Sequence, residues 1–305
     1  MAKQRAHLLA NQGSGQGAGN TISKLAESIC QELGFELVVH DIHESKELSL
    51  KAKEAIASAE QNQDVVMIAG GDGSVRSVAE LAVGKNIRFA VIPCGTFNFF
   101  ARTHEIPEDL GQAIRTALTG SLKKVRLGSM NDHVFLVNAS LGLYAKSIIN
   151  REQDTTKFGR NRIVVILSTL SSFLSRHKIL DVTFCSENQE KKLHTSMIFI
   201  GNNAMQLRNL SVPVVRCLSQ DLLALVILKP LKKLDVVRLM FRGLFKFWDH
   251  EDRLQSFCVE SATIRSKRSV HLVALDGEVF HLKSPLTIKT MHDALNLVVP
   301  EHNRE

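Results

Sequence analysis

Apolar and polar positions alternate along the first 127 residues in a pattern that predicts strands separated by amphipathic helices. Runs such as RAHLLA (5–10) and DVVMIA (64–69) are short, continuous and apolar, as expected of strands buried on both faces of a parallel sheet. Between them, Leu25, Ile29 and Leu33 recur at helical spacing. The series continues with strands at 35–41 and 87–92 and helices at 49–61, 74–83 and 109–120. We therefore expect an N-terminal parallel α/β domain over residues 1–127.

The pattern changes after residue 127, where short strand-like runs such as HVFLVNASLG (133–142) and LLALVILK (222–229) dominate. Runs of this length separated by turn residues predict a mostly antiparallel, sandwich-like domain over residues 128–305. Two segments, 160–175 and 232–248, are predicted to be helical.

Charge and cysteine content narrow the functional classes. The net charge is +7, and residues 1–127 hold 14 basic and 14 acidic residues, so the whole surplus lies in the second domain. A basic surplus is compatible with a nucleotide or an anionic membrane surface; we expect no nucleic-acid partner, and the oligomeric state stays open. The five cysteines are scattered and form no C-x-x-C pair, so we expect neither a disulfide framework nor a zinc site, and we expect a cytoplasmic protein.

Glycine-rich loops follow three strands of the first domain: NQGSGQGAG (11–19), GGDGS (70–74) and PCGTFN (93–98). In a parallel sheet all three leave the carboxyl edge, where ligands of open α/β folds bind. Glycines allow backbone N–H groups to close on a phosphate, and a following helix N-terminus adds unpaired donors. The loops match neither G-x-x-x-x-G-K-[ST] nor G-x-G-x-x-G, which excludes the P-loop and the usual dinucleotide fingerprint.

These motifs, read together, resemble those of the diacylglycerol-kinase-type lipid kinases, a family that includes bacterial lipid kinases and the sphingosine and ceramide kinases. GGDGS is similar to the family's GGDGT, and PCGTFNFFAR is similar to its P-x-G-T-x-N-D-F-A-R. NQGSGQG, NASLGLYA and ALDGEVF resemble further motifs, in the family order. The resemblance implies ATP bound in the cleft between the two domains, and a chain end that packs back on the first domain.

The resemblance also implies roles for particular residues. Asp276 would be the general base that accepts the proton of a lipid hydroxyl, and Glu278 would stand near Mg²⁺ and the nucleotide. Asp72 and Glu278 carry the hard oxygen ligands that Mg²⁺ prefers. The residues expected to surround ATP are Asn11, Ser14, Gly15, Gly70, Gly71, Asp72, Gly73, Ser74, Gly95, Thr96 and Asn98. On local grounds alone, Asp-Gly at 276–277 is equally a hairpin turn.

The chain departs from the family pattern at several positions. Phe99 stands where the family has an aspartate, and Gln220 and Ala224 replace the acids of a D-G-x-L-D-V motif, so we expect no second, structural Mg²⁺. Two alternatives to a lipid kinase stay open: an NAD kinase, which shares GGDG, and a sensor that binds ATP or lipid without phosphoryl transfer.

A lipid kinase would associate peripherally with an anionic membrane. The segment 234–253 combines cations at four-residue spacing with apolar bulk and Trp248, which suits a bilayer interface. Its alternative is a helix docked on the second domain with its basic face in solvent. For the segment 159–178, a core helix is favoured over the lining of a lipid-entry groove.

Overall fold

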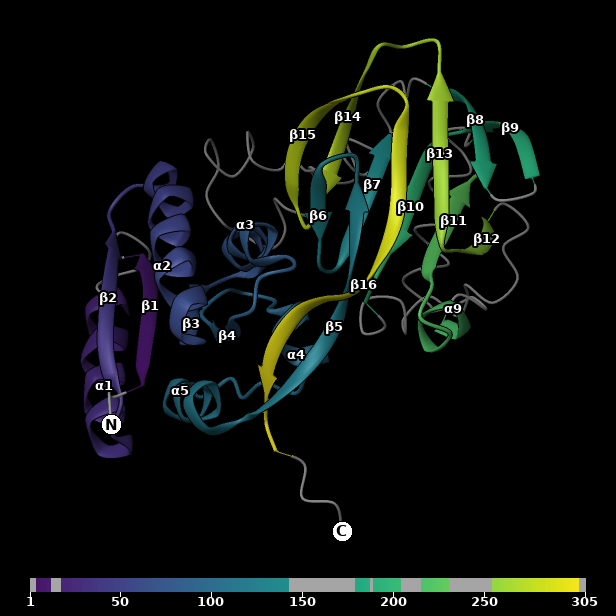
Figure 1. The fold of residues 1–305 in the computed structure, drawn as a ribbon. Coiled ribbons are helices and arrows are strands. Elements are labelled where there is room, and N and C mark those ends of the chain that lie inside the picture. The colour runs from purple at the N-terminus through teal and green to yellow at the C-terminus, as the bar shows by residue number, and fades with distance from the viewer. Residues whose placement is uncertain are drawn as a thin grey trace, which may run out of the picture. The chain divides into compact units, whose positions relative to one another are not determined.

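The computed structural model describes residues 4–11, 18–142, 179–186, 189–203, 215–230 and 254–301. It divides into two compact units, the first formed by Met1–Leu127 with Met291–Glu305 and the second by Gly128–Thr290 (Figure 1). The segments 159–178 and 234–253, with the two helices expected near them, lie outside the described residues.

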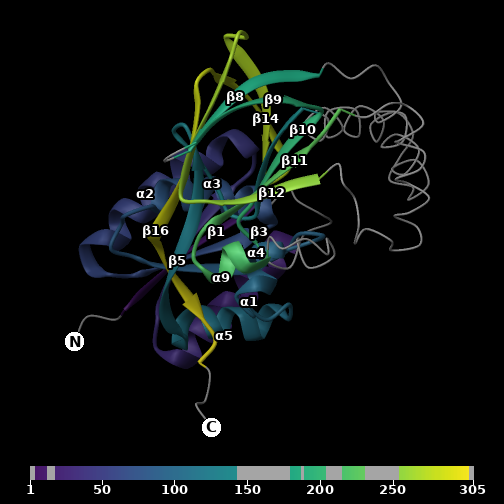
Figure 2. The ribbon, with the colours of Figure 1, turned by 90° about the vertical axis from the view of Figure 1, so that its right-hand side faces the viewer.

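The first unit contains a parallel sheet in the strand order β2-β1-β3-β4-β16. Its strands are β1 (Arg5–Asn11), β2 (Glu36–Ile42), β3 (Val65–Gly70), β4 (Arg88–Pro93), part of β5 (Ser121–Met130) and the end of β16 (Leu286–Val299). Its helices are α1 (Ala18–Leu33), η1 (Ser45–Glu47), α2 (Leu48–Asn62), α3 (Asp72–Ala82), α4 (Phe99–Thr103) and α5 (Leu110–Thr119). The helices associate as α1 with α5 and α2 with α3 (Figure 2).

The continuous apolar runs explain the central strands of this unit. Residues 65–69 of β3 and 89–93 of β4 are buried throughout, as strands covered on both faces must be. The helix expected at 74–83 begins two residues earlier, at Asp72, because Gly71 adopts an extended conformation and acts as its N-cap. Asp72 therefore lies in the first helical turn, where a carboxylate interacts favourably with the helix dipole.

The second unit is built from antiparallel sheets, and one of them has the order β12-β11-β10-β7-β14-β15. The other runs from the start of β16 through β13 and β8 to β9, and β5 with β6 joins it. The elements are β6 (His133–Phe135), β7 (Asn138–Gly142), β8 (Leu180–Ser186), β9 (Gln189–Thr195), β10 (Met197–Gly201), α9 (Val215–Ser219), β11 (Leu223–Leu228), β12 (Leu254–Val259), β13 (Ser261–Ser266), β14 (Val270–Leu275) and β15 (Glu278–Lys283).

Side chains from both sheets of the second unit form one hydrophobic cluster. It includes Leu141, Ile198 and Leu225 from the first sheet and Ile264 and Ile288 from the second, all at most 1% exposed. The alternation of buried and exposed positions along β13 and β8 matches sheets with one face packed and one face free. The expected fold class, a parallel α/β domain with an antiparallel β-rich domain, is confirmed.

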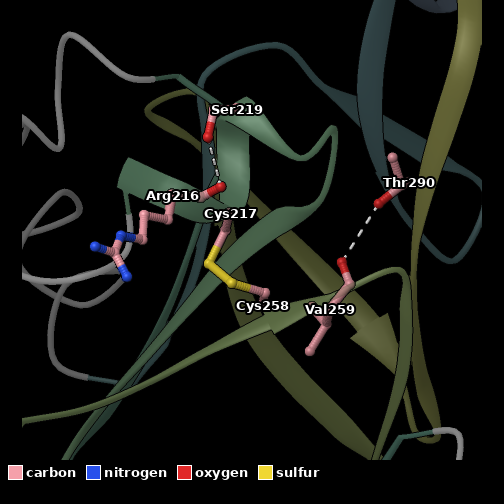
Figure 3. The surroundings of a disulfide bond; sticks show 6 residues. All are labelled: Arg216, Cys217, Ser219, Cys258, Val259 and Thr290. Atoms are coloured by element: carbon pink, nitrogen blue, oxygen red, sulfur yellow. Dashed lines mark hydrogen bonds between the residues drawn. A yellow bond between two sulfur atoms is a disulfide. The ribbon is translucent and has the colours of Figure 1, made fainter.

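A disulfide bond joins Cys217 of α9 to Cys258 of β12 (Figure 3). The expectation that the cysteines form no disulfide was therefore wrong for this pair, and the argument for a reducing compartment that rested on it no longer holds. The sequence separation of 41 residues hid the pairing, because it depends on β11 bringing α9 next to its partner strand β12. In Figure 3 the bond lies beside the hydrogen bond from Ser219 Oγ to the Arg216 carbonyl, 2.8 Å long, which closes α9.

Replacing both cysteines, C217S/C258S, is expected to lower the free energy of unfolding of the second unit by about 4 kcal/mol. The bond closes a loop of 41 residues. In the chain-entropy model, such a cross-link lowers the conformational entropy of the unfolded chain and so stabilises the folded state by about that amount. Urea unfolding under oxidising conditions measures the difference. With dithiothreitol present, wild type and variant should unfold at the same urea concentration; a difference that persists would mean that lost packing, not the bond, is responsible.

Candidate active site

The loops that follow β3 and β4 approach each other at two glycines. A Cβ atom on Gly95 would lie 2.6 Å from the Gly71 Cα, and a Cβ on Gly71 would lie 3.2 Å from the Gly95 Cα. The Cys94 N–H also donates to the Gly70 carbonyl at 3.0 Å. No other residue fits at Gly95 without moving backbone, so the glycines in the two motifs serve this contact.

Asp72 joins the same two loops through its side chain. One carboxylate oxygen accepts the Phe99 N–H at 3.2 Å and the other accepts the Phe100 N–H at 3.1 Å. Both donors belong to the first turn of α4, whose N–H groups have no partner within their own helix. Each oxygen retains lone-pair positions for further donors or a cation, but the contact that the structure shows positions the loops.

Asn98 closes the tight turn at the end of the second loop. Its Oδ1 accepts the Gly95 N–H and its Nδ2 donates to the Gly95 carbonyl, both at 2.9 Å. Its φ is +49°, a left-handed conformation that asparagine adopts more readily than most residues. The turn leaves Thr96 and Phe97 exposed at its tip.

Phe99, which departs from the family motif, preserves the backbone contact and changes the surface. The bond to Asp72 uses the main-chain N–H, which any residue except proline supplies. The Phe99 ring stacks on Phe97, with centroids 5.4 Å apart and planes 4° from parallel, and Phe97 is 56% exposed. The structure therefore has a stacked aromatic pair where the family motif has a carboxylate, while the main-chain bond to Asp72 is present.

The other predicted loop residues lie as follows. Gly73 and Ser74 belong to the first turn of α3 and are partly buried, as are Gly70 and Gly71. Asn11 is the last residue of β1, in parallel register with Ile42. Ser14 and Gly15 lie outside the described residues.

In the second unit, Asp276 begins the turn between β14 and β15. Its φ is +47° and that of Gly277 is +90°, as in the two-residue hairpin turns that Asp-Gly favours. The interpretation of Asp-Gly as a hairpin turn and its interpretation as a functional motif are therefore compatible, because the turn conformation determines where the carboxylate of Asp276 points.

The Asp276 carboxylate lies in a cradle of three consecutive backbone N–H groups. Leu136 donates to one oxygen at 2.6 Å, and Val137 and Asn138 donate to the other at 2.8 Å. The Asp276 N–H donates in return to the Asn138 carbonyl at 2.9 Å. These three donors hold the carboxylate in one orientation.

Asn202 supports this cradle, and sequence reasoning missed it. Its side-chain amide donates to the Leu136 carbonyl at 3.0 Å and its N–H donates to the Val137 carbonyl at 2.8 Å. Asn202 is 8% exposed. The signal in the sequence was the pair of asparagines, Asn202 and Asn203, that follows the strand-like run MIFIG (197–201). A buried amide at a strand end requires hydrogen-bond partners.

Glu278, the residue expected near Mg²⁺, is the first residue of β15 and pairs with Leu275 across the hairpin. It is partly buried. Within the described parts of the chain, no three histidine, cysteine or acidic side chains gather as ligands for a metal. The assignment of Asp72 and Glu278 to Mg²⁺ therefore stays a prediction.

His104, at the end of α4, connects the stability of this loop region to pH. Its ring packs edge-on against Phe100 with centroids 4.8 Å apart, and its Nδ1 is buried. Burial lowers the pKa of the imidazole to about 4, and the charge of Lys123 lowers it further to a lesser extent. Between pH 6.5 and 4 the unfolded chain therefore binds a proton at His104 that the folded chain does not.

The free energy of unfolding of the first unit should fall as the pH drops from 6.5 to 4, by up to about 3 kcal/mol from His104. Above pH 6.5 His104 is neutral in both the folded and the unfolded chain, so this loss of stability is absent there. In H104Q the slope of stability against pH should decrease, and the slope that remains comes from His7 and His40, whose pKa values burial also lowers. Urea unfolding at several pH values measures this. An H104Q slope equal to that of the exposed-site control H281Q would contradict it.

Comparisons with known proteins agree with this geometry. Residues 5–130 match the model of the diacylglycerol kinase catalytic domain. These residues make up less than half of the chain. The matched residues include the loops joined by Asp72, Gly71 and Gly95, while Asp276 lies beyond them.

Similar proteins include a diacylglycerol kinase of Staphylococcus saprophyticus, 33% identical over 37% of this chain and 36% of that protein. A protein of Cronobacter sakazakii named as a YegS-like lipid kinase is 26% identical over 47% of this chain and 48% of the relative. The chain thus matches half or less of these two proteins' length. A Staphylococcus haemolyticus protein named as a lipid kinase is 25% identical over 93% of this chain and 91% of its own.

Among solved structures, a diacylglycerol kinase from Bacillus anthracis aligns with a TM-score of 0.70 over 97% of both chains, at 18% identity. At this identity the similarity shows the fold alone. It extends over both units of this chain, including the β-rich unit that carries Asp276.

Proposed function

We propose that the protein is an ATP-dependent lipid kinase that transfers the γ-phosphate to a primary hydroxyl of diacylglycerol or a related lipid. The observation that carries the proposal is the junction of the GGDGS and PCGTFN loops within the residues that match the diacylglycerol kinase catalytic domain model. Asp72 and the Gly71–Gly95 contact hold the two loops together. Backbone N–H groups at a glycine-rich strand end and at the first turn of a helix are suited to phosphate groups.

In this proposal the residues around the phosphates are Asn11, Ser14, Gly15, Gly70, Gly71, Asp72, Gly73, Ser74, Gly95, Thr96 and Asn98. Asp276 accepts the proton of the lipid hydroxyl while that oxygen forms a bond to the γ-phosphorus and the bond to the ADP oxygen breaks. The three N–H groups that hold its carboxylate fix its direction before the substrate arrives.

A divalent cation such as Mg²⁺ would neutralise charge on the nucleotide phosphates. Asp72 and Glu278 have suitable oxygen ligands, and the Asp72 oxygens have remaining capacity beside the two N–H donors. The part this chain plays is to keep the loop backbone in place, through the two N–H groups that Asp72 accepts.

The lipid substrate places the protein at a membrane surface, and we propose a peripheral association with anionic membranes. Among the residues that the structure describes, no helix combines the length and apolar character needed to cross a bilayer.

Transfer of labelled γ-phosphate from ATP to a panel of lipids tests the proposal. Diacylglycerol, ceramide and sphingosine in mixed micelles, with NAD as a separate acceptor, would be resolved by thin-layer chromatography. We expect label in diacylglycerol or a related lipid. Label in NAD alone would identify an NAD kinase, and ATP binding without any labelled product would identify a sensor.

A further inference from the structure

A pocket of about 630 Å³ lies in the second unit, against β8, β9 and the hairpin between β13 and β14. Its lining includes Lys192, Arg265, Lys267 and Arg268, and Asp181 is the sole acidic residue among the described residues that line it. A smaller hollow of about 350 Å³ adjoins the hairpin and shares residues 265–268 with it. The volume lies in the range of pockets that bind small ligands.

The strand register explains why the cations face the same space. Thr183 of β8 pairs with Arg265 of β13 on one side and with Lys192 of β9 on the other. Directly paired residues of antiparallel strands have side chains on the same face of the sheet. Arg265, Thr183 and Lys192 therefore form one row, and Asp181 with His194 forms the next row on that face.

The charge of this face is not neutralised within the described part of the chain. The side chains of Lys192, Arg265, Lys267 and Arg268 are exposed, and the ion pairs found among the described residues do not involve them. Asp181 contacts His194.

The hairpin that presents the cations is ordered by its own hydrogen bonds. Ser266 Oγ accepts the Arg268 N–H at 3.0 Å and lies 2.7 Å from the buried His271 Nε2. Burial lowers the pKa of His271, so this imidazole is neutral near pH 7 and the positive charge of the pocket comes from lysine and arginine. A pocket with fixed geometry and surplus positive charge selects an anion.

Apolar side chains in the lining indicate where that anion is carried. Ile179 lines the pocket and is 39% exposed, and Leu180, Val182 and Leu193 also line it. Aliphatic side chains beside cations suit the boundary between lipid headgroups and acyl chains, because the acyl chains offer them an apolar contact. A free inorganic anion offers no such contact.

We propose that this pocket binds the phosphate headgroup of an anionic phospholipid and attaches the second unit to the membrane surface. The inference extends the proposed membrane association, but it concerns a site separate from the nucleotide loops and needs no phosphoryl transfer. Binding can therefore be measured without nucleotide, so failure of this inference and failure of the kinase assignment are distinguishable.

Co-sedimentation with phosphatidylcholine vesicles, with and without phosphatidylglycerol, tests it at physiological ionic strength. The wild type should bind the phosphatidylglycerol vesicles more tightly. The variant R265Q/K267Q/R268Q should lose about a hundredfold in affinity, since each cation near an anionic surface contributes about fivefold. The control K24Q/K53Q/K123Q removes the same charge from exposed positions of the first unit and should lose much less. Equal losses of vesicle affinity in the two variants would show that the membrane is attracted by the overall charge of the protein, and would overturn the assignment of the binding site to this pocket.

Two further arms separate a lipid pocket from its alternatives. T183W fills the pocket between Arg265 and Lys192 and leaves every charge in place, so it should weaken vesicle binding; unchanged binding by a protein that still unfolds cooperatively would overturn the assignment. Inorganic phosphate at millimolar concentration should not displace the wild type from the vesicles. Displacement would identify a site for soluble phosphate and overturn the assignment to a lipid.

Discussion

Replacing Asp276 with asparagine is expected to lower kcat for lipid phosphorylation about a thousandfold while the Kd for ATP changes by less than about twofold. Loss of a general base removes a contribution of that size. The side chain amide can still accept N–H bonds with its oxygen, but its NH₂ group cannot accept one, so one of the three bonds to residues 136–138 is lost. We expect this to reduce stability by about 1–3 kcal/mol.

The measurement therefore needs both rates and stability. Transfer of labelled phosphate to diacylglycerol gives kcat, equilibrium binding gives the Kd for ATP, and urea unfolding gives stability. D132N, which changes an exposed carboxylate in the turn before β6, is the control and should match the wild type in all three. Retained activity in D276N would show that another group is the base. Activity that falls only in proportion to the unfolded fraction would show a structural role.

Replacing Gly95 with alanine is expected to lower the transfer rate at least about a hundredfold. The new Cβ would lie 2.6 Å from the Gly71 Cα and 2.7 Å from the Asn98 Oδ1, so the loop must move and the bonds of Asn98 to the Gly95 backbone must weaken. A displacement of about 1 Å in groups that position a substrate has an effect of this order. The change should also weaken ATP binding, in contrast to D276N.

Gly111→Ala is the matched control for this change. A Cβ at Gly111 would lie at an ordinary contact distance of 3.4 Å from Asp109 Oδ1, and alanine in the helix α5 should stabilise the first unit by up to about 1 kcal/mol. ATP affinity and transfer rate should stay at the wild-type level in G111A. If G95A also binds ATP with wild-type affinity, the close contact of the two loops is not needed for the nucleotide.

These two predictions depend on contacts that the motifs did not reveal. The sequence predicted that GGDGS and PCGTFN lie at one edge of the sheet, and it assigned Asp72 to Mg²⁺ and phosphate. In the structure the Asp72 carboxylate accepts the N–H groups of Phe99 and Phe100. In the sequence, Phe99 stands where the family motif has an aspartate. The contact with Asp72 uses the Phe99 main-chain N–H, however, and a sequence motif specifies side chains and does not show which main-chain groups donate hydrogen bonds.

The sequence by itself determined the fold class, because the spacing of apolar residues states which face of each element must be buried. It also revealed the resemblance to the diacylglycerol-kinase-type lipid kinases, through motifs whose residues are close in sequence. Only the tertiary structure decided which distant groups meet: Cys217 with Cys258, the cradle of Asp276 with Asn202 behind it, and the row of Arg265, Thr183 and Lys192. The physical reason is that strand register and turn conformation fix these neighbours, and both depend on packing between segments that are remote along the chain.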